Sequence, residues 1–383
     1  MGKIVLTKIG ALVSGDVNNP LIKADSVLIE SGLIKEIGSG RELEKKANQV
    51  IDTNGMTVAP GLIDSHCHPV FGDFTPKQFA LNFIENSLHG GVTTIISAGE
   101  VHLPGRPRDP ESAKALAYLA YKSFTNYRPA GVKVHAGALI LESGLTEEDF
   151  KNLASKGVWL VGEVGLGSAG MTEAKQMVKW AQENGMKVTM HAGGVSIGAI
   201  VVGAKDLLEV GPDIVSHING GPTAMPPQEI EEVIAQGEMA FEIVTFGNPK
   251  MTDFAIRQAQ KHKALHRVII GNDAPSGAGL APVGVLRTLT HLASVDAIPP
   301  ETAIAFATGN TARVYGLDVG LVARNMPADL IVMDCPKGSI GEDALSAMAA
   351  GDCPSVALVM IDGEVLVTQS RNTMPPLRKI EIR

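Results

Sequence analysis

The sequence predicts an α/β protein, namely a (β/α)8 TIM barrel with a small β-sandwich domain formed by the N- and C-terminal segments. Eight short apolar runs in the middle of the chain each precede a helix-like stretch, which is the alternation that a parallel barrel requires. Both ends of the chain consist instead of short β-rich runs separated by turn residues. With 383 residues, 45% of them hydrophobic, the chain is long enough for a barrel and a smaller domain.

The two ends of the chain, residues 1–55 and 321–383, are expected to form the sandwich. Apolar runs at 4–6, 26–29 and 33–34 are separated by glycine, asparagine and proline, and similar runs recur at 329–333 and 356–361. The last of these is followed by Asp362-Gly363, a sequence typical of a tight hairpin turn. Because neither end is long enough to bury a core of its own, we expect the two to pack together.

The middle, residues 56–320, is expected to form the barrel. The expected strands are 62–64, 93–96, 132–134, 159–162, 187–190, 213–216, 240–244 and 267–270, and amphipathic patterns predict helices at 76–89, 146–156, 172–184, 227–236 and 252–263. Thr146, followed three residues later by Asp149, is a candidate capping box. An open doubly wound sheet is the alternative, but no Gly-x-Gly-x-x-Gly follows the first strand.

Composition narrows the class of protein. There are 33 Lys and Arg against 41 Asp and Glu, a net charge of −8, which disfavours nucleic acid and anionic membranes as partners. Three cysteines are few for a chain of this length, and an odd number of them does not suit a disulfide framework. We therefore expect the protein to reside in a reducing compartment. No apolar run approaches the roughly 18 residues of a membrane span. We therefore expect a cytoplasmic protein that acts on a small molecule.

The ends of the expected strands are rich in metal-ligand side chains: His66, His68, Glu163, His191, His217 and Asp273. The carboxyl ends of barrel strands meet at one mouth, and His66 and His68 share a face because side chains alternate along a strand. Four histidines and two carboxylates crowded there would lack partners without a cation. Nitrogen and oxygen ligands suit zinc or iron, and six of them suit two divalent metal ions.

Two stretches resemble the amidohydrolase superfamily of metal-dependent hydrolases: Val-Ala-Pro-Gly-Leu-Ile-Asp-Ser-His-Cys-His at 58–68 and Ala-Asp-Leu-Ile-Val-Met-Asp at 328–334. The resemblance covers essentially the whole chain and implies a barrel with a sandwich shared by both termini. In the common subtype a carboxylated lysine at the end of strand four bridges the metals. The nearest lysine here, Lys156, precedes that strand, so Glu163 would have to bridge. His66, His68 and Asp273 would then bind one ion, and His191 and His217 the other.

The phrases at 162–167, 216–223 and 271–277 resemble members of this superfamily that open a lactam. That resemblance implies hydrolysis of 6-oxo-1,4,5,6-tetrahydronicotinate to 2-formylglutarate and ammonia, with Asp273 as the catalytic proton shuttle, and it implies a homotetramer. A heterocycle deaminase with one metal, or another cyclic amidohydrolase, is the alternative. A non-enzymatic protein with a decayed site is disfavoured because all six candidate ligands are present together.

Further polar residues near the strand ends are weaker candidates for substrate contacts: His135, Asn219, Thr223 and Arg106. Each has a plain structural interpretation as well, namely a backbone hydrogen bond, a tight turn or a solvated arginine. Cys67 is expected to pack on the opposite face of its strand from His66 and His68. His262, His266 and His291 lie in helix-like stretches away from the strand ends, so we expect no ligand role for them.

Overall fold

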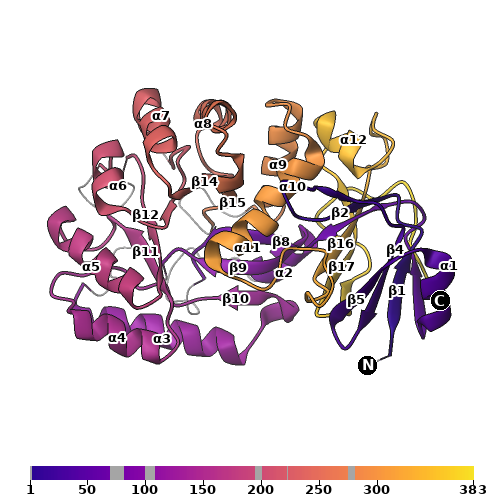
Figure 1. The fold of residues 1–383 in the computed structure, drawn as a ribbon, viewed down its shortest axis with the longest axis horizontal. Coiled ribbons are helices and arrows are strands. Elements are labelled where there is room, and N and C mark those ends of the chain that lie inside the picture. Colours follow the sequence, from indigo (N-terminus) through magenta and orange to yellow (C-terminus); the bar gives the residue numbers. More distant parts are fainter. Residues whose placement is uncertain (1, 70–81, 100–107, 195–200, 222, 275–280) are drawn as a thin grey trace.

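The structure is a computed structural model that describes residues 2–69, 82–99, 108–194, 201–221, 223–274 and 281–383. Eight short strands alternate with helices through the middle of the chain, and the strand-rich chain ends lie together at one side (Figure 1). Both termini lie in that second part. The predicted α/β fold, a barrel with a small domain built from both ends of the chain, is confirmed.

The barrel strands are parallel and lie in two groups. They are β8 (Leu62–Cys67), β9 (Val92–Ser97), β10 (Lys133–His135), β11 (Leu160–Val164), β12 (Lys187–Met190), β13 (Ile214–Val215), β14 (Ala240–Val244) and β15 (Val268–Gly271). One group runs β10-β9-β8 and the other β11-β12-β13-β14-β15. Single bridges join the groups at both edges, from Leu139 to Val161 and from Cys67 to Ala274. These bridges close the ring of eight strands.

Polar bonds reinforce the closure between the first and last barrel strands. The Asp64 carboxylate, buried on β8, accepts the backbone N–H of Asn272 at 2.9 Å and its side-chain amide at 2.7 Å. The backbone N–H of Asp273 donates to the carbonyl of His66 at 3.0 Å. The residues after β15 are thereby held against the end of β8, which places Asp273 beside the His66–His68 segment.

Helices follow the strands and cover the barrel. They are α2 (Phe83–His89), α3 (Pro110–Asn126), α4 (Glu147–Ser155), α5 (Met171–Glu183), α6 (Ala204–Val210), α7 (Pro227–Gln236), α8 (Pro249–Lys261), α9 (Gly284–Ser294), α10 (Pro300–Phe306) and α11 (Gly309–Tyr315). The predicted capping box is present at α4, where the Asp149 carboxylate accepts the Thr146 backbone N–H at 2.8 Å. Residues 76–81 of the first predicted helix lie outside the described residues.

The sandwich consists of two sheets. One has the order β19-β6-β1-β4-β5 and the other β18-β17-β16-β7-β2-β3. The strands from the front of the chain are β1 (Ile4–Thr7), β2 (Ala11–Val13), β3 (Leu21–Ile22), β4 (Ser26–Glu30), β5 (Leu33–Gly38), β6 (Gln49–Asp52) and β7 (Thr57–Pro60). Those from the end are β16 (Leu330–Asp334), β17 (Ser355–Ile361), β18 (Glu364–Val367) and β19 (Glu381–Ile382). Two short helices, α1 (Gly40–Leu43) and α12 (Ala344–Ala349), accompany them.

The sandwich is shared because strands from both ends pair with each other. β16 pairs antiparallel with β7, and β19 pairs antiparallel with β6. Side chains alternate along β16: Leu330 and Val332 pack between the two sheets, whereas Ile331 and Met333 join the larger core that includes the barrel helices. The predicted Asp362-Gly363 hairpin joins β17 to β18, with both residues at positive φ, 48° and 77°. The division at residues 55/56 and 320/321 stays a prediction.

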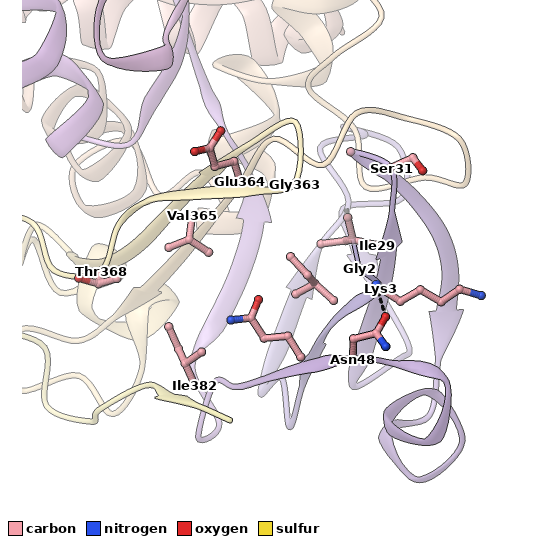
Figure 2. A pocket seen from close by; sticks show the side chains of 13 residues that line it. Gly2, Lys3, Ile29, Ser31, Asn48, Gly363, Glu364, Val365, Thr368 and Ile382 are labelled. Atoms are coloured by element: carbon pink, nitrogen blue, oxygen red, sulfur yellow. Dashed lines mark hydrogen bonds between the residues drawn. The ribbon is translucent and has the colours of Figure 1, made fainter.

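A cavity of about 630 Å³ lies in the sandwich, lined by both terminal segments (Figure 2). Ile29, Val365 and Ile382 are among its lining residues, and the Lys3 backbone N–H donates to Asn48 Oδ1 at 2.8 Å beside it. The lining comes from β1, β4, β6, β18, β19 and their loops, so this cavity does not contain the predicted metal ligands. Among the described residues, no helix is long and apolar enough to cross a membrane.

Candidate metal centre

The six side chains predicted as metal ligands converge at the carboxyl ends of the barrel strands. His66 lies near the end of β8 and Glu163 near the end of β11. The other four follow the ends of β8, β12, β13 and β15: His68, His191, His217 and Asp273. Five of the six side chains are at most 5% exposed, and Asp273 is 18% exposed. Asp273 is therefore the member most accessible from the barrel mouth.

Glu163 lies at the centre of this group. Its Oε1 atom is 2.9 Å from His217 Nε2 and 3.8 Å from both His66 Nε2 and His191 Nδ1. His66, His68 and Glu163 offer ligand atoms within 4.8 Å of one another, and so do Glu163, His191 and His217. One carboxylate thus belongs to two ligand sets at once, which is the arrangement that a bridging ligand requires.

Asp273 completes the first of these sets. Its Oδ1 atom lies 3.3 Å from His68 Nε2 and 3.6 Å from His66 Nε2. Its other oxygen, Oδ2, faces Gly221 in the loop after β13, where a Cβ atom added to the glycine would lie 3.9 Å away. Asp273 therefore presents one oxygen to the histidines and the other to the loop that borders the mouth.

Several polar atoms of these residues lack hydrogen-bond partners and could bind a metal ion instead. His66 Nε2 and His191 Nδ1 are buried without a hydrogen-bond partner among the described residues, and the 2.9 Å contact of Glu163 Oε1 with His217 Nε2 does not have the geometry of a hydrogen bond either. Leaving three buried polar atoms without partners would cost free energy, whereas a divalent cation would satisfy all of them. Imidazole nitrogen with carboxylate oxygen is a donor set that zinc and ferrous iron accept.

Groups behind the ligands orient the imidazole rings. His66 Nδ1 lies 2.6 Å from Glu242 Oε2, His68 Nδ1 lies 2.9 Å from the Gly99 carbonyl, and His191 Nε2 lies 2.9 Å from the Gly194 carbonyl. A ring that donates its N–H to such an acceptor directs the lone pair of its other nitrogen into the cluster. The rings are therefore held in the tautomer that can bind a metal.

The charges of the cluster also favour a cation. Burial alone would raise the pKa of Glu163, but the nearby histidines, His217 first, hold the pKa of its carboxyl well below its usual range. Burial would lower the pKa of His66, yet Glu242 and Glu163 together raise it to about 10. The carboxylates thus retain a proton on His66 when no other cation is present, and a metal ion would displace that proton on binding.

Glu242 is a residue of this site that the prediction from sequence missed. It lies on β14, is 1% exposed, and accepts hydrogen bonds from His66 and from the Ser65 hydroxyl. A signal was present, because Glu242 is the single charged residue in the apolar run 240–244. A carboxylate inside a buried strand requires polar partners, and the cluster of strand ends supplies them.

Two residues predicted to contact the substrate make other interactions in the structure. The ring of His135 packs edge-on against Trp159 at 5.5 Å between centroids, and Trp159 precedes β11, at the end of the barrel opposite the ligand cluster. The structure thus places His135 away from the ligand cluster, four residues before the bridge between Leu139 and Val161. Asn219 is fully buried, and its amide makes three hydrogen bonds, donating to the Val244 carbonyl and the Thr252 hydroxyl and accepting the Val244 backbone N–H, so both of its donors are already used.

The remaining candidates differ in position. Thr223 is exposed, and its carbonyl accepts the backbone N–H of Gly194 at 3.3 Å, which places it next to the loop that follows His191. Arg106 lies outside the described residues.

Cys67 packs in the core as expected, with its thiol 3.1 Å from Asp64 Oδ2. Lys156, at the end of α4, lies over the Tyr118 ring and so does not take part in the cluster.

Comparison with known proteins agrees with this geometry. The family model described as "Amidohydrolase family" matches residues 57–366. The chain is 52% identical to enamidase from Eubacterium barkeri over 386 residues, which cover 100% of both proteins. A crystal structure of enamidase superposes with a TM-score of 0.96 at 51% identity, again over 100% of both chains.

A more distant relative, adenine deaminase 2 from Desulfotalea psychrophila, is 24% identical over 377 residues, which cover 96% of this chain and 58% of that protein. The family match spans well over half of the chain, and the enamidase match spans all of it. The chain therefore belongs to the amidohydrolase family and is a hydrolase that acts on carbon–nitrogen bonds.

Proposed function

We propose that this protein opens the six-membered lactam ring of 6-oxo-1,4,5,6-tetrahydronicotinate and releases ammonia and 2-formylglutarate. The observation that carries the proposal is the position of Glu163, whose Oε1 lies within 4 Å of nitrogen atoms from both histidine sets. The likeness to enamidase over the full chain supports the choice of a lactam among the cyclic amides.

Two divalent ions, zinc or iron, would be held by six side chains in this proposal. His66, His68 and Asp273 would bind one ion, His191 and His217 the other, and Glu163 both. Bound there, divalent ions would supply Lewis acidity toward a carbonyl oxygen and an acidified water near neutral pH. Glu242 would act behind them as a positioning residue for His66.

Asp273 would move the proton during ring opening. Amide hydrolysis needs a base for the attacking water and an acid for the ring nitrogen, because an amide nitrogen is a poor leaving group. The carboxylate of Asp273 has one oxygen at the histidines and one facing the loop at the mouth. It can therefore accept the proton of the attacking water and deliver it to the nitrogen when the C–N bond breaks.

The ammonia would come from the product of ring opening rather than from the amide step itself. Cleavage of the lactam leaves an enamine, which tautomerises to an imine, and a second water converts the imine to an aldehyde and ammonia. Two waters are therefore consumed for each lactam. Arg106 remains a proposal for the group that holds the substrate carboxylate, and Thr223 for a hydrogen bond to the substrate.

The decisive experiment incubates the metal-replete protein with the lactam and measures ammonia and aldehyde together. The proposal predicts the two products in equal amounts. The alternative, deamination of a heterocycle, rests on the likeness to adenine deaminase over 96% of the chain. Ammonia from adenine or another aminoheterocycle, with no aldehyde from the lactam, would replace our proposal by that alternative.

We also propose a homotetramer in the cytoplasm. The cytoplasmic assignment is supported by the cysteines, since Cys67, Cys335 and Cys353 are all free and two of them are buried. The tetramer is supported by the resemblance to lactam-opening amidohydrolases. Light scattering on the purified protein tests the tetramer, and a monomer would remove it.

A further inference from the structure

A second group of ligand-type side chains lies on the outer helices, away from the strand ends. Asp253 belongs to α8, His291 to α9, and Asp296 follows the end of α9. His291 Nε2 lies 2.8 Å from Asp253 Oδ1 and 4.0 Å from Asp296 Oδ2. One ligand atom from each residue lies within 4.8 Å of the other two.

Asp296 is the unusual member of this group. Its side chain is 2% exposed, yet its Oδ2 atom has no hydrogen-bond partner among the described residues. A buried carboxylate oxygen without a partner costs free energy that an ordinary surface ion pair would not require. The oxygen faces His291 at a distance too long for a hydrogen bond, and the gap leaves room for an ion between them.

The electrostatic surroundings of Asp296 also call for a cation. Burial and the negative charge of Asp253 raise the pKa of Asp296 to about 6, while His291 and the exposed Arg257 oppose the shift with smaller effects. Two carboxylates that repel each other beside an imidazole form a donor set of two oxygens and one nitrogen. A divalent cation would relieve that repulsion and satisfy the buried oxygen at the same time.

The spacing of the three residues fits zinc. With bonds of about 2.0 Å in a tetrahedral site, ligand atoms lie about 3.3 Å apart. The separations of 2.8 and 4.0 Å lie on either side of that value, so small side-chain adjustments would reach it. His291 and Asp253 are 33% and 24% exposed, which leaves a side open for a water as fourth ligand.

We propose that Asp253, His291 and Asp296 form a peripheral divalent-cation site that takes Zn²⁺, separate from the centre at the barrel mouth. The ion would tie α8, which follows β14, to the turn after α9 and would stabilise the folded chain. This revises the expectation that His291 has no ligand role. The sequence concealed the site because Asp253 and His291 are 38 residues apart on different helices.

The test counts zinc ions. The holoenzyme and its D253N and D296N variants are dialysed against buffered Zn²⁺, and the metal content per chain is measured by elemental analysis. H262N is the matched control, because His262 is also a partly exposed helix-end histidine, but it lies 3.6 Å from a single carboxylate, Glu231. The wild type and H262N are expected to hold one more zinc per chain than D253N or D296N.

A second readout separates this site from the centre at the mouth. Neither aspartate belongs to that centre, so lactam hydrolysis by D253N and D296N is expected to match the wild type. Added zinc is expected to raise the melting temperature of the wild type and H262N but not of the two variants. H291Q repeats the comparison if an aspartate variant fails to fold. Equal zinc content in the wild type and the variants, or an equal loss in H262N, would overturn the proposal.

Discussion

Glu242 Oε2 lies 2.6 Å from His66 Nδ1, and the same carboxylate accepts the hydroxyl of Ser65, the residue before His66. β14 thereby holds the ring of a residue on β8, across the inside of the barrel. Since the Nδ1–H is directed at Glu242, the Nε2 atom faces Glu163 and Asp273. One buried carboxylate therefore fixes both the tautomer and the orientation of a proposed metal ligand.

Replacing Glu242 by glutamine should weaken metal binding without removing a ligand. Loss of such a supporting carboxylate typically lowers metal affinity about 10–100-fold. Titration of the apoprotein with Zn²⁺ in the presence of a competing chelator measures the affinity. E238Q is the control, because Glu238 is exposed and precedes the same strand. An unchanged affinity in E242Q would contradict the positioning role, and excess metal should restore its activity if that role is correct.

Replacing Glu163 by glutamine should lower the metal content of the purified protein below two ions per chain. The amide cannot bridge as an anion, and the cluster would lose the carboxylate that both histidine sets share. Elemental analysis of E163Q beside the wild type checks this expectation. Two tightly bound ions in E163Q would show that Glu163 is not needed as a bridge.

Replacing Asp273 by asparagine should leave metal bound but slow the reaction. Asparagine keeps an oxygen for the ion but cannot accept a proton, and loss of a general acid–base group typically costs about 10²–10⁴-fold in kcat. The rate of lactam loss is compared at equal metal content. A metal-loaded D273N enzyme that works near the parent rate would rule out the shuttle.

His135 should make stability depend on pH. Burial, together with the charges of Lys133 and Arg128, lowers the pKa of His135 to about 4, below its ordinary 6.5. The unfolded chain therefore binds more protons between these values, so stability is complete above pH 6.5 and falls as the pH drops toward 4. Between pH 7.5 and 5 this residue should account for a loss of about 2 kcal/mol.

Urea unfolding of the metal-free protein at both pH values measures that loss. In H135Q the loss should be smaller by about that amount, since glutamine does not titrate. Using metal-free protein removes the contribution of metal release at low pH. The same pH dependence in H135Q and the wild type would assign the effect to other groups.

The eight barrel strands and the shared sandwich could be predicted from the sequence, because each depends on local periodicity and chain order. Each of the runs predicted as strands contains or overlaps an observed strand, from β8 to β15. Strand ends such as 66–68 and 271–273 then locate the ligands, since parallel strands bring their ends to one mouth. To predict that these residues converge, it was enough to assume that the eight strands close into a ring.

Features that depend on contacts between elements distant in sequence could not be predicted in this way. His135 ends a short apolar run, and only the later bridge at Leu139 and the contact with Trp159 show that it lies toward the end of the barrel opposite the ligand cluster. Asn219 was a candidate for a substrate contact because it follows a strand end, but its amide bonds instead to Val244 and Thr252, on elements distant in sequence. The Asp253–His291–Asp296 group depends on how two helices pack, which no motif records.

The central claim, a two-ion centre that opens a lactam, is tested most directly by titrating the apoprotein with metal while following lactam loss. The D296N background is suitable because it disrupts the peripheral group, so that added Zn²⁺ reports on the barrel mouth. The account predicts a rate that rises with added zinc and reaches its plateau at two ions per chain. A plateau at one ion, or no lactam loss at any ratio, would contradict it.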